Sequence, residues 1–166
     1  TLMCGRQVSK STSGAAQGLV FSACVPQVTT LYITPLFEQV RKFSANYVKP
    51  FIVESPMRSL MTDTTTGNSV LQREFRNRSK MLFSFANDNA DRVRGISCDL
   101  IKIDEVQDTD MDILRIIFET STFSKWNVQW MSGTPKTLDN TLTKFWNQSS
   151  RAEWFIRCRE AGCNEW

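Results

Sequence analysis

Two short segments, far apart in this chain of 166 residues, place the strongest constraint on its fold. The first, Gly5 to Thr12, is a turn that presents Lys10 and Ser11 between an apolar stretch and a predicted helix. The second, Leu100 to Glu105, is a largely apolar strand that ends in two adjacent carboxylates. Phosphate recognition and magnesium-assisted attack on a phosphoanhydride require these two parts together. In this order they predict nucleoside triphosphate hydrolysis.

The composition describes one globular domain. Hydrophobic residues make up 41% of the chain and charged residues 22%, as is typical of a folded protein. The net charge of +3 is too small to predict a nucleic-acid partner by itself. No apolar run approaches the roughly 18 to 20 residues that cross a bilayer, so no membrane partner is expected. The chain has no histidine, which excludes imidazole chemistry, and its five cysteines, without a signal peptide, favour reduced thiols.

Strand and helix signals alternate along the chain. This alternation predicts an α/β fold with a mostly parallel central sheet. Strands are expected at 2–4, 28–34, 99–104, 127–132 and 153–158, helices at 10–24, 36–47, 111–120 and 138–146, and a hairpin of 70–75 with 80–86. The Pro-, Ser- and Thr-rich residues 50–68 are expected to form a surface excursion. We expect 1–150 to form the nucleotide-binding core, truncated at its N-terminal side, and 151–166 to begin a cysteine-containing extension.

The turn before Lys10 departs from the strict phosphate-loop pattern G-x-x-x-x-G-K-[ST]. Cys4 and Ser9 occupy its two glycine positions. Glycine is favoured there because the backbone needs a positive φ or a close approach to phosphate. In the phosphate-binding interpretation, Lys10 neutralises the outer phosphates and the Ser11 hydroxyl ligates magnesium. In the alternative, Ser9, Ser11 and Thr12 form a polar turn that caps the following helix.

The acidic strand end also has two interpretations. Asp104 would hold magnesium through water and Glu105 would polarise the attacking water, because ligands of open α/β sheets gather at the carboxyl ends of the strands. In the alternative, the carboxylates of this region form a solvated acidic turn, and Asp108 or Asp110 caps the next helix. Capping does not account for two carboxylates directly at the strand end, which favours the catalytic interpretation.

With these segments placed, the chain resembles the ATPase domain of the large terminase subunit of tailed bacteriophages over essentially its whole length. The matching motifs, in the family's order, are Arg6–Ser11, Tyr32–Pro35 with Phe43–Ser44, Asp91–Ser97, Ile103–Asp108 and Ser132–Pro135. The resemblance implies a RecA-like P-loop NTPase of the ASCE type with three αβα layers. It implies magnesium-dependent ATP hydrolysis that drives double-stranded DNA into procapsids. We expect the family's nuclease domain to be absent from this chain.

The resemblance also implies partners and residue roles. The partners are the portal of the procapsid, the small terminase subunit and further copies of the chain in a ring, all in the host cytoplasm. The implied nucleotide-binding residues are Arg6, Gln7, Val8, Ser9, Lys10, Ser11 and Thr12. Arg6 would contact the terminal phosphate, Ser11 and Asp104 would hold magnesium, and Glu105 would be the catalytic carboxylate.

Two further implied roles have alternatives. Arg94 is the implied arginine finger, which reaches the active site of a neighbouring subunit, but no spacing rule distinguishes it from Arg92. Both could instead be ordinary residues of a basic stretch that touches DNA phosphates or is solvated. Ser132, Gly133 and Thr134 are implied to couple the nucleotide state to DNA movement. By themselves they would be an ordinary strand-terminating turn.

The C-terminal segment carries Cys158 and Cys163 with C-x₄-C spacing. A structural zinc site needs four ligands, so this pair would be half a site, completed only by ligands further downstream. Within the chain itself, two free thiols are the simpler interpretation.

Two rival functions remain at this point. A helicase of the same broad class has a similar acidic motif, although the turn of Ser132 to Pro135 and the upstream Arg94 count against it. The second rival is a nucleotide-binding scaffold in which the imperfect phosphate loop no longer supports turnover.

Overall fold

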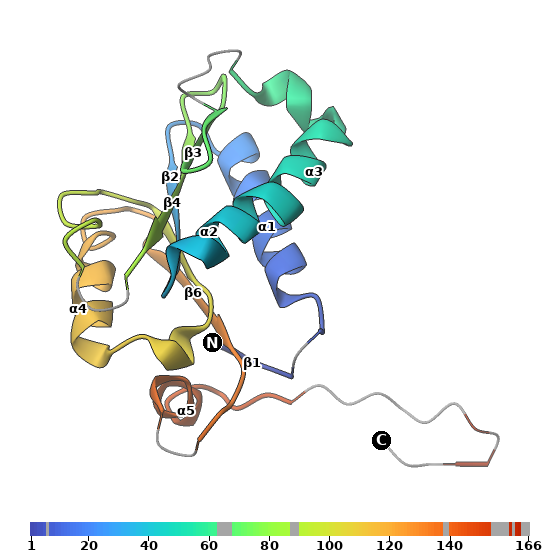
Figure 1. Ribbon diagram of the computed structural model, residues 1–166, viewed down its shortest axis with the longest axis vertical. Helices are drawn as coiled ribbons and strands as arrows, with labels where there is room; N and C mark the ends of the chain where they lie inside the picture. The colour runs from blue at the N-terminus through green and yellow to red at the C-terminus, as the bar shows by residue number, and fades with distance from the viewer. Residues whose placement is uncertain are drawn as a thin grey trace.

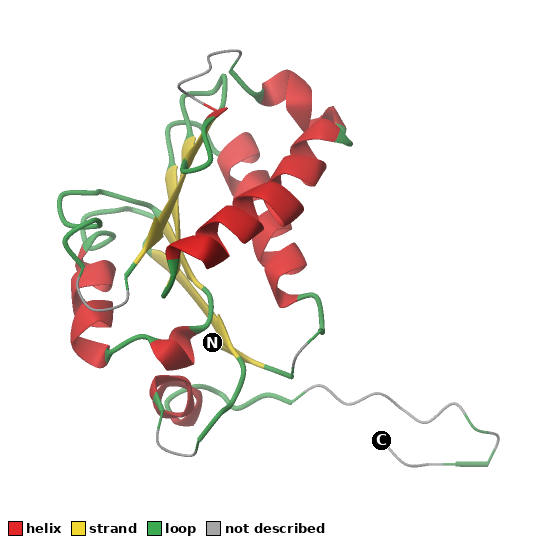
Figure 2. Cartoon of the chain, viewed as in Figure 1, coloured by secondary structure: helices red, strands yellow, loops and turns green. Residues whose placement is uncertain are grey.

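A six-stranded sheet in the order β1-β6-β5-β2-β4-β3 forms the centre of the computed structural model (Figure 2). The structure describes residues 1–5, 7–62, 68–86, 90–137, 140–153, 160 and 162–163. The strands are β1 (Leu2–Met3), β2 (Thr29–Thr34), β3 (Gln72–Glu74), β4 (Lys80–Phe85), β5 (Leu100–Ile103) and β6 (Val128–Gly133). All pairs are parallel except β3 with β4, which form an antiparallel hairpin. The predicted α/β fold with a mostly parallel sheet is confirmed.

Helices cover both faces of this sheet (Figure 1). One face carries α1 (Lys10–Cys24), α2 (Phe37–Phe43) and α3 (Lys49–Val53), and the other carries α4 (Met111–Glu119). The short helix α5 (Thr141–Asn147) contributes Leu142 to the same hydrophobic cluster as α4. The three layers expected from the sequence are therefore present. None of the helices in the described ranges is both long and apolar enough to cross a membrane.

The alternation of side chains along β2 divides the hydrophobic core into two clusters. Leu31 and Ile33 belong to the cluster on the α4 side, whereas Tyr32 belongs to the cluster on the α1 side. All three are at most 2% exposed, because a central parallel strand is covered on both faces. On the neighbouring strand β5, Ile101 and Ile103 face α4, while Lys102 is turned toward α1. A lysine therefore occupies a position where the layer arrangement would favour an apolar residue.

The segment after β2 differs from the expectation. A helix was expected to end at Tyr47 and a surface excursion to begin at Pro50, but the chain continues through a π-helical turn, η1 (Ser44–Val48), directly into α3. In an α-helix the ring of Pro50 would collide with the carbonyl four residues earlier. The wider π-turn, in which the Lys49 N–H donates to the Ser44 carbonyl, lets the helix pass through the proline. A short 3-10 helix, η2 (Pro56–Leu60), follows.

Most other predicted elements agree with the structure within the usual uncertainty of helix and strand ends. The helix expected at 10–24 and the strand expected at 28–34 are present as α1 and β2. The helix expected at 138–146 begins at Thr141, and its preceding residues 138–139 lie outside the described part. The strand expected at 153–158 also lies outside it, apart from its first residue, so that prediction and the boundary at 150 stay predictions.

Candidate nucleotide-binding site

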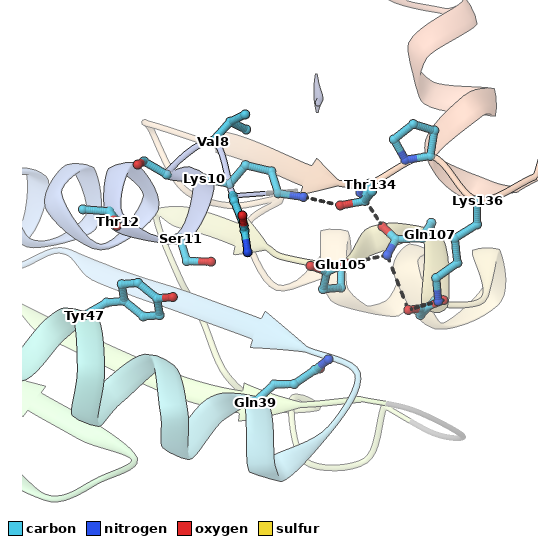
Figure 3. A pocket seen from close by; sticks show the side chains of 14 residues that line it. Val8, Lys10, Ser11, Thr12, Gln39, Tyr47, Glu105, Gln107, Thr134 and Lys136 are labelled. Atoms are coloured by element: carbon cyan, nitrogen blue, oxygen red, sulfur yellow. Dashed lines mark hydrogen bonds and ion pairs between the residues drawn. The ribbon is translucent and has the colours of Figure 1, made fainter. Parts of the chain in front are cut away.

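A cavity of about 530 Å³ opens at the carboxyl ends of the central strands (Figure 3). The first sequence segment contributes residues 7–12 to its lining, and the second contributes Glu105. The lining residues are Gln7, Val8, Ser9, Lys10, Ser11, Thr12, Gln39, Tyr47, Glu105, Gln107, Asp108, Thr134, Pro135 and Lys136. The phosphate loop, the acidic strand end and the turn after β6 thus meet in one place. This convergence follows from the strand order, which sets β5 between β6 and β2.

The phosphate loop adopts the backbone that its missing glycine would favour. Ser9 has φ 61° and ψ 25°, a left-handed conformation, and Gln7 also has a positive φ of 60°. The Ser9 side chain makes no capping hydrogen bond to α1, so the alternative of a serine-capped turn is not supported. Helix α1 instead begins on the cavity with Lys10, as a phosphate-binding helix does. Arg6 lies outside the described residues.

We expect Ser9→Gly to stabilise the protein. A non-glycine residue in the left-handed region costs about 1 kcal/mol or more, and glycine removes this cost at the expense of backbone entropy in the unfolded chain. The expected net gain in the free energy of unfolding is about 0.5 to 1 kcal/mol. Urea denaturation measures it. Ser13→Gly, at an exposed position inside α1, is the matched control and should lower stability by about 0.5 kcal/mol. A loss of stability in Ser9→Gly would contradict the strained-loop interpretation.

Asp104 is the most completely hydrogen-bonded group of the site. Its Oδ2 accepts from Ser11 Oγ at 3.1 Å and from Tyr32 Oη at 3.2 Å. Its Oδ1 accepts from Ser132 Oγ at 2.6 Å and from the Glu105 backbone N–H at 3.1 Å. The side chain is 5% exposed, and a buried carboxylate requires such partners. Asp104 therefore joins the phosphate loop, β2 and β6 at one point.

Tyr32 was placed in a family motif by the sequence, but no role was predicted for it. Burial raises the pKa of its hydroxyl well above the ordinary value, and the charge of Asp104 together with the hydrogen bond to it raises the pKa further. The hydroxyl consequently stays protonated and donates to Asp104. Its ring stacks on Phe43 with 3.6 Å between centroids and an interplanar angle of 7°. Strand adjacency of β2 and β5 creates the contact with Asp104, and no sequence spacing signals it.

Glu105 and Thr134 are linked through a side chain that the sequence interpretation left without a role. Glu105 is half-buried and accepts a hydrogen bond from Gln107 Nε2, while Gln107 Oε1 accepts from the Thr134 backbone N–H at 3.2 Å. Thr134 Oγ1 in turn accepts from Lys10 Nζ at 2.6 Å (Figure 3). At the edge of the cavity, Lys136 and Asp108 form an exposed ion pair at 2.7 Å.

The expected helix cap is present just beyond the site. Asp110 precedes α4, and its side chain accepts from the Asp112 N–H at 2.8 Å. This capping role had been assigned to Asp108 or Asp110 as an alternative to metal binding. It belongs to Asp110, whereas Asp104 and Glu105 face the site.

The two candidate finger arginines lie outside their own chain's cavity. Arg94 is exposed and its Nε lies 3.5 Å from Asp91 Oδ1. The guanidinium of Arg92 lies over the ring of Phe85, 4.6 Å from its centroid. Neither residue lines the nucleotide cavity. Arg92 is thus stacked on an aromatic ring of β4, whereas the side chain of Arg94 extends into solvent.

The cysteines contribute little to the described site. Cys4, Cys24, Cys98 and Cys163 are free thiols, and Cys158 lies outside the described residues. Burial raises the pKa of the Cys98 thiol to about 11. The described part of the chain holds no group of three or more Cys, Asp or Glu side chains arranged for a metal ion. The half zinc site of Cys158 and Cys163 stays a prediction.

The donors at the strand end fit magnesium rather than a softer metal. Magnesium prefers oxygen ligands and is commonly held by one or two carboxylates together with substrate phosphates and water. Ser11 Oγ and Asp104 Oδ2, 3.1 Å apart beside the phosphate loop, are oxygen atoms of the kind that could hold it. A cage of several protein carboxylates is not required for this arrangement.

The fold and the site together define a P-loop nucleoside triphosphatase of the RecA-like type. The sequence model of the family described as phage terminase large subunit gpA, ATPase domain, matches residues 1–166. The chain therefore belongs to the ATPase-domain family of phage terminase large subunits. No protein with a curated description matches it.

The solved structures that this chain resembles include several large terminases. The large terminase ATPase domain of Thermus phage P74-26 has a TM-score of 0.66 at 16% identity, covering 83% of this chain and 60% of that one. The bacteriophage HK97 large terminase has a TM-score of 0.75 at 12% identity, covering 90% and 32%. The large terminase from a thermophilic bacteriophage, solved in complex with ATP-gamma-S, has a TM-score of 0.63 at 11% identity, covering 90% and 36%. The chain thus spans 60% of the first structure and about a third of the other two.

Proposed function

We propose that this chain is the magnesium-dependent ATPase unit of a phage DNA-packaging motor. The observation that carries the proposal is the contact of Ser11 Oγ with Asp104 Oδ2, beside a cavity that Lys10, Ser11 and Glu105 line. Family membership supports the same activity, and one structural neighbour was solved with ATP-gamma-S. The family match does not favour the helicase alternative.

The geometry supports a role for each residue of the site. Lys10 leaves Thr134 for the outer phosphates, and α1 directs its N-terminus at them. Ser11 and Asp104 would hold magnesium, which supplies charge neutralisation to the phosphates. Glu105 orients a water for in-line attack on the terminal phosphorus. The attack breaks the bond between this phosphorus and the bridging oxygen and releases phosphate and ADP. The turn of Ser132, Gly133 and Thr134 contacts Asp104 through Ser132 and Lys10 through Thr134. This turn would therefore respond to loss of the terminal phosphate.

Arg94 would complete the site of a neighbouring copy in a homo-oligomeric ring. Its exposure and its position outside its own cavity support action in trans. An arginine that enters a phosphoryl-transfer site from another subunit stabilises the charge of the transition state.

Mixing of two inactive variants tests the finger. Arg94→Ala is expected to lower hydrolysis by the assembled motor by at least about tenfold. Mixing Arg94→Ala with Glu105→Gln subunits should restore part of the rate, because some sites then combine an intact Glu105 with an intact neighbouring Arg94. Arg92→Ala measured in parallel separates the two candidates. Restoration by Arg92→Ala instead of Arg94→Ala would assign the finger to Arg92.

The proposed DNA partner has a candidate surface on the α1 side of the sheet. A second cavity of about 560 Å³ is lined by Lys49, Arg58 and Arg73, and no carboxylate is among its described lining residues. Arg73 is 8% exposed, and its Nη2 donates to Ser44 Oγ at 2.9 Å. Cations without a nearby carboxylate favour a phosphate backbone as ligand.

The remaining partners rest on family membership alone. They are the portal of the procapsid and the small terminase subunit, and the motor would act in the host cytoplasm. A zinc ion would join Cys158 and Cys163 only if further ligands follow.

The direct test is phosphate release by the full-length protein with ATP, with and without magnesium, DNA and procapsids. Hydrolysis that requires magnesium and rises with DNA and procapsids supports the motor, with Lys10→Ala as the inactive reference. Nucleotide binding without hydrolysis would support the scaffold alternative and overturn the proposal.

A further inference from the structure

Gln107 occupies the centre of the site, although neither the sequence pattern nor the family motifs assign it a role. It lies in the 3-10 helix η4 (Val106–Asp108) and is 9% exposed. Its amide is used at both ends, since Nε2 donates to Glu105 Oε2 and Oε1 accepts from the Thr134 N–H. Figure 3 shows the resulting chain of contacts from Lys10 through Thr134 and Gln107 to Glu105.

We propose that Gln107 is a positioning residue that holds the Glu105 carboxylate in place and ties its orientation to the turn after β6. This inference rests on the proposed ATPase function and adds a residue to it. Through Thr134, the same contact makes the position of Glu105 depend on where the Lys10 amine is bound.

The hydrogen-bonding chemistry admits one orientation of the amide. A carboxylate oxygen only accepts, and a backbone N–H only donates. If the Gln107 amide were reversed, its oxygen would face the Glu105 carboxylate and its NH₂ group would face the Thr134 N–H. Both contacts would then be repulsive in a largely buried place. Gln107 thus fixes one carboxylate oxygen of Glu105 and leaves the other for the water.

The absence of a side chain at Gly133 independently indicates that the Gln107 amide must occupy this position. A Cβ added at Gly133 would collide with Gln107 Oε1, while the next contact, with Leu142 Cδ2, would be 3.1 Å. The nearest obstacle is therefore the flexible end of Gln107 rather than backbone. Any other residue at this position of the turn would displace the amide from Thr134.

The contact of Lys10 with Thr134 supplies the link to the nucleotide. The Lys10 amine binds the Thr134 hydroxyl at 2.6 Å, and the outer phosphates would compete for the same amine. When the amine moves to the phosphates, the Thr134 hydroxyl loses its partner while its backbone N–H stays bound to Gln107. Gln107 consequently connects the movement of the Lys10 amine to the phosphates with Glu105, the residue that orients water.

The experiment compares Gln107→Leu with wild type in the full-length protein. Leucine has a similar size but lacks both hydrogen bonds. We expect kcat to fall roughly tenfold, because the carboxylate loses its orientation. The KM for ATP and the affinity for a fluorescent ATP analogue should change less than about twofold, because Gln107 is not placed on the phosphates. Gln129→Leu, at an exposed position of β6, is the matched control.

A double-mutant cycle keeps the test decisive if Gln107→Leu folds poorly. Gly133→Ala is expected to lower kcat in the wild-type background by displacing the amide. In a Gln107→Ala background the collision with the amide is gone and only the flexible Leu142 side chain must shift slightly, so Gly133→Ala should cost much less than in wild type. Additive losses, or an unchanged kcat in both Gln107 variants, would overturn the inference while wild-type hydrolysis still supports the ATPase. An inactive wild type would overturn the proposed function and this inference with it.

Discussion

Replacing Glu105 with glutamine is expected to lower ATP hydrolysis by roughly 10²–10⁴-fold. The amide keeps the length of the side chain and an oxygen that can accept from Gln107. It carries no negative charge, however, and so cannot orient water as a carboxylate does. Nucleotide affinity should stay within about threefold of wild type, because in the proposed mechanism Lys10 and the start of α1 bind the phosphates. Phosphate release and binding of a fluorescent ATP analogue measure the two quantities.

The matched control for this variant is Glu119→Gln. Glu119 is an exposed carboxylate at the end of α4, outside the cavity lining, and its loss should leave hydrolysis within about twofold. Equal activity of Glu105→Gln and wild type would assign the water-orienting role to another group. Loss of binding together with hydrolysis would instead indicate that Glu105 acts through the structure of the site.

The second large effect is on stability and concerns Lys102. Its side chain is 1% exposed, and its Nζ lies 2.9 Å from Gln17 Oε1 and 4.0 Å from the centroid of the Trp130 ring. Burial lowers the pKa of Lys102 from 10.5 to about 8, although the charge of Asp104 acts in the opposite direction. The folded protein therefore releases this proton at a lower pH than the unfolded chain.

The sign of the effect follows from proton binding. Between pH 8 and 10.5 the unfolded chain holds the Lys102 proton and the folded chain does not, so stability rises with pH in this window. The destabilising contribution is fully present below pH 8 and disappears above 10.5. It corresponds to about 1.4 kcal/mol per pH unit, or about 3 kcal/mol across the window.

Lys102→Met removes this contribution and makes it measurable. Urea denaturation of wild type and variant, between about pH 7 and 10 with a chelator present, yields the difference in unfolding free energy. We expect the unfolding free energy of wild type to rise relative to that of the variant as the pH rises above the folded-state pKa of about 8. Lys125→Met, which removes an exposed lysine beside Trp126, should show a flat difference. A flat difference for Lys102→Met as well would refute the prediction.

Local signals in the sequence were sufficient for most of the sheet and for the two segments of the site. The β-branched run before Pro35 predicted β2, and the apolar strand before Asp104 predicted β5, because both patterns are local. The helix signal after Ser9 likewise predicted α1. Their meeting at one edge of the sheet follows from the general topology of α/β folds.

Contacts between strands and loops could not be predicted in the same way. That Tyr32 donates to Asp104, or that Gln107 accepts from Thr134, depends on which strands are neighbours and in which register. The burial of Lys102 depends on the same arrangement, since its register partner on β6 is Trp130. The π-turn at Ser44–Val48 arises because the helix meets Pro50, and a proline normally predicts the end of a helix. These features are properties of the assembled fold.

The pairing of β1 with β6 has a thermodynamic consequence. Met3 is in register with Gly133, and the Cys4 N–H donates to the Gly133 carbonyl at 3.3 Å. The strand that enters the phosphate loop is therefore hydrogen-bonded to the strand that enters the turn of Ser132 to Thr134. If DNA binding shifts that turn and thereby changes the affinity for nucleotide, nucleotide binding must change the affinity for DNA by the same factor. Measuring either affinity with and without the other ligand would therefore quantify the coupling energy between the two sites.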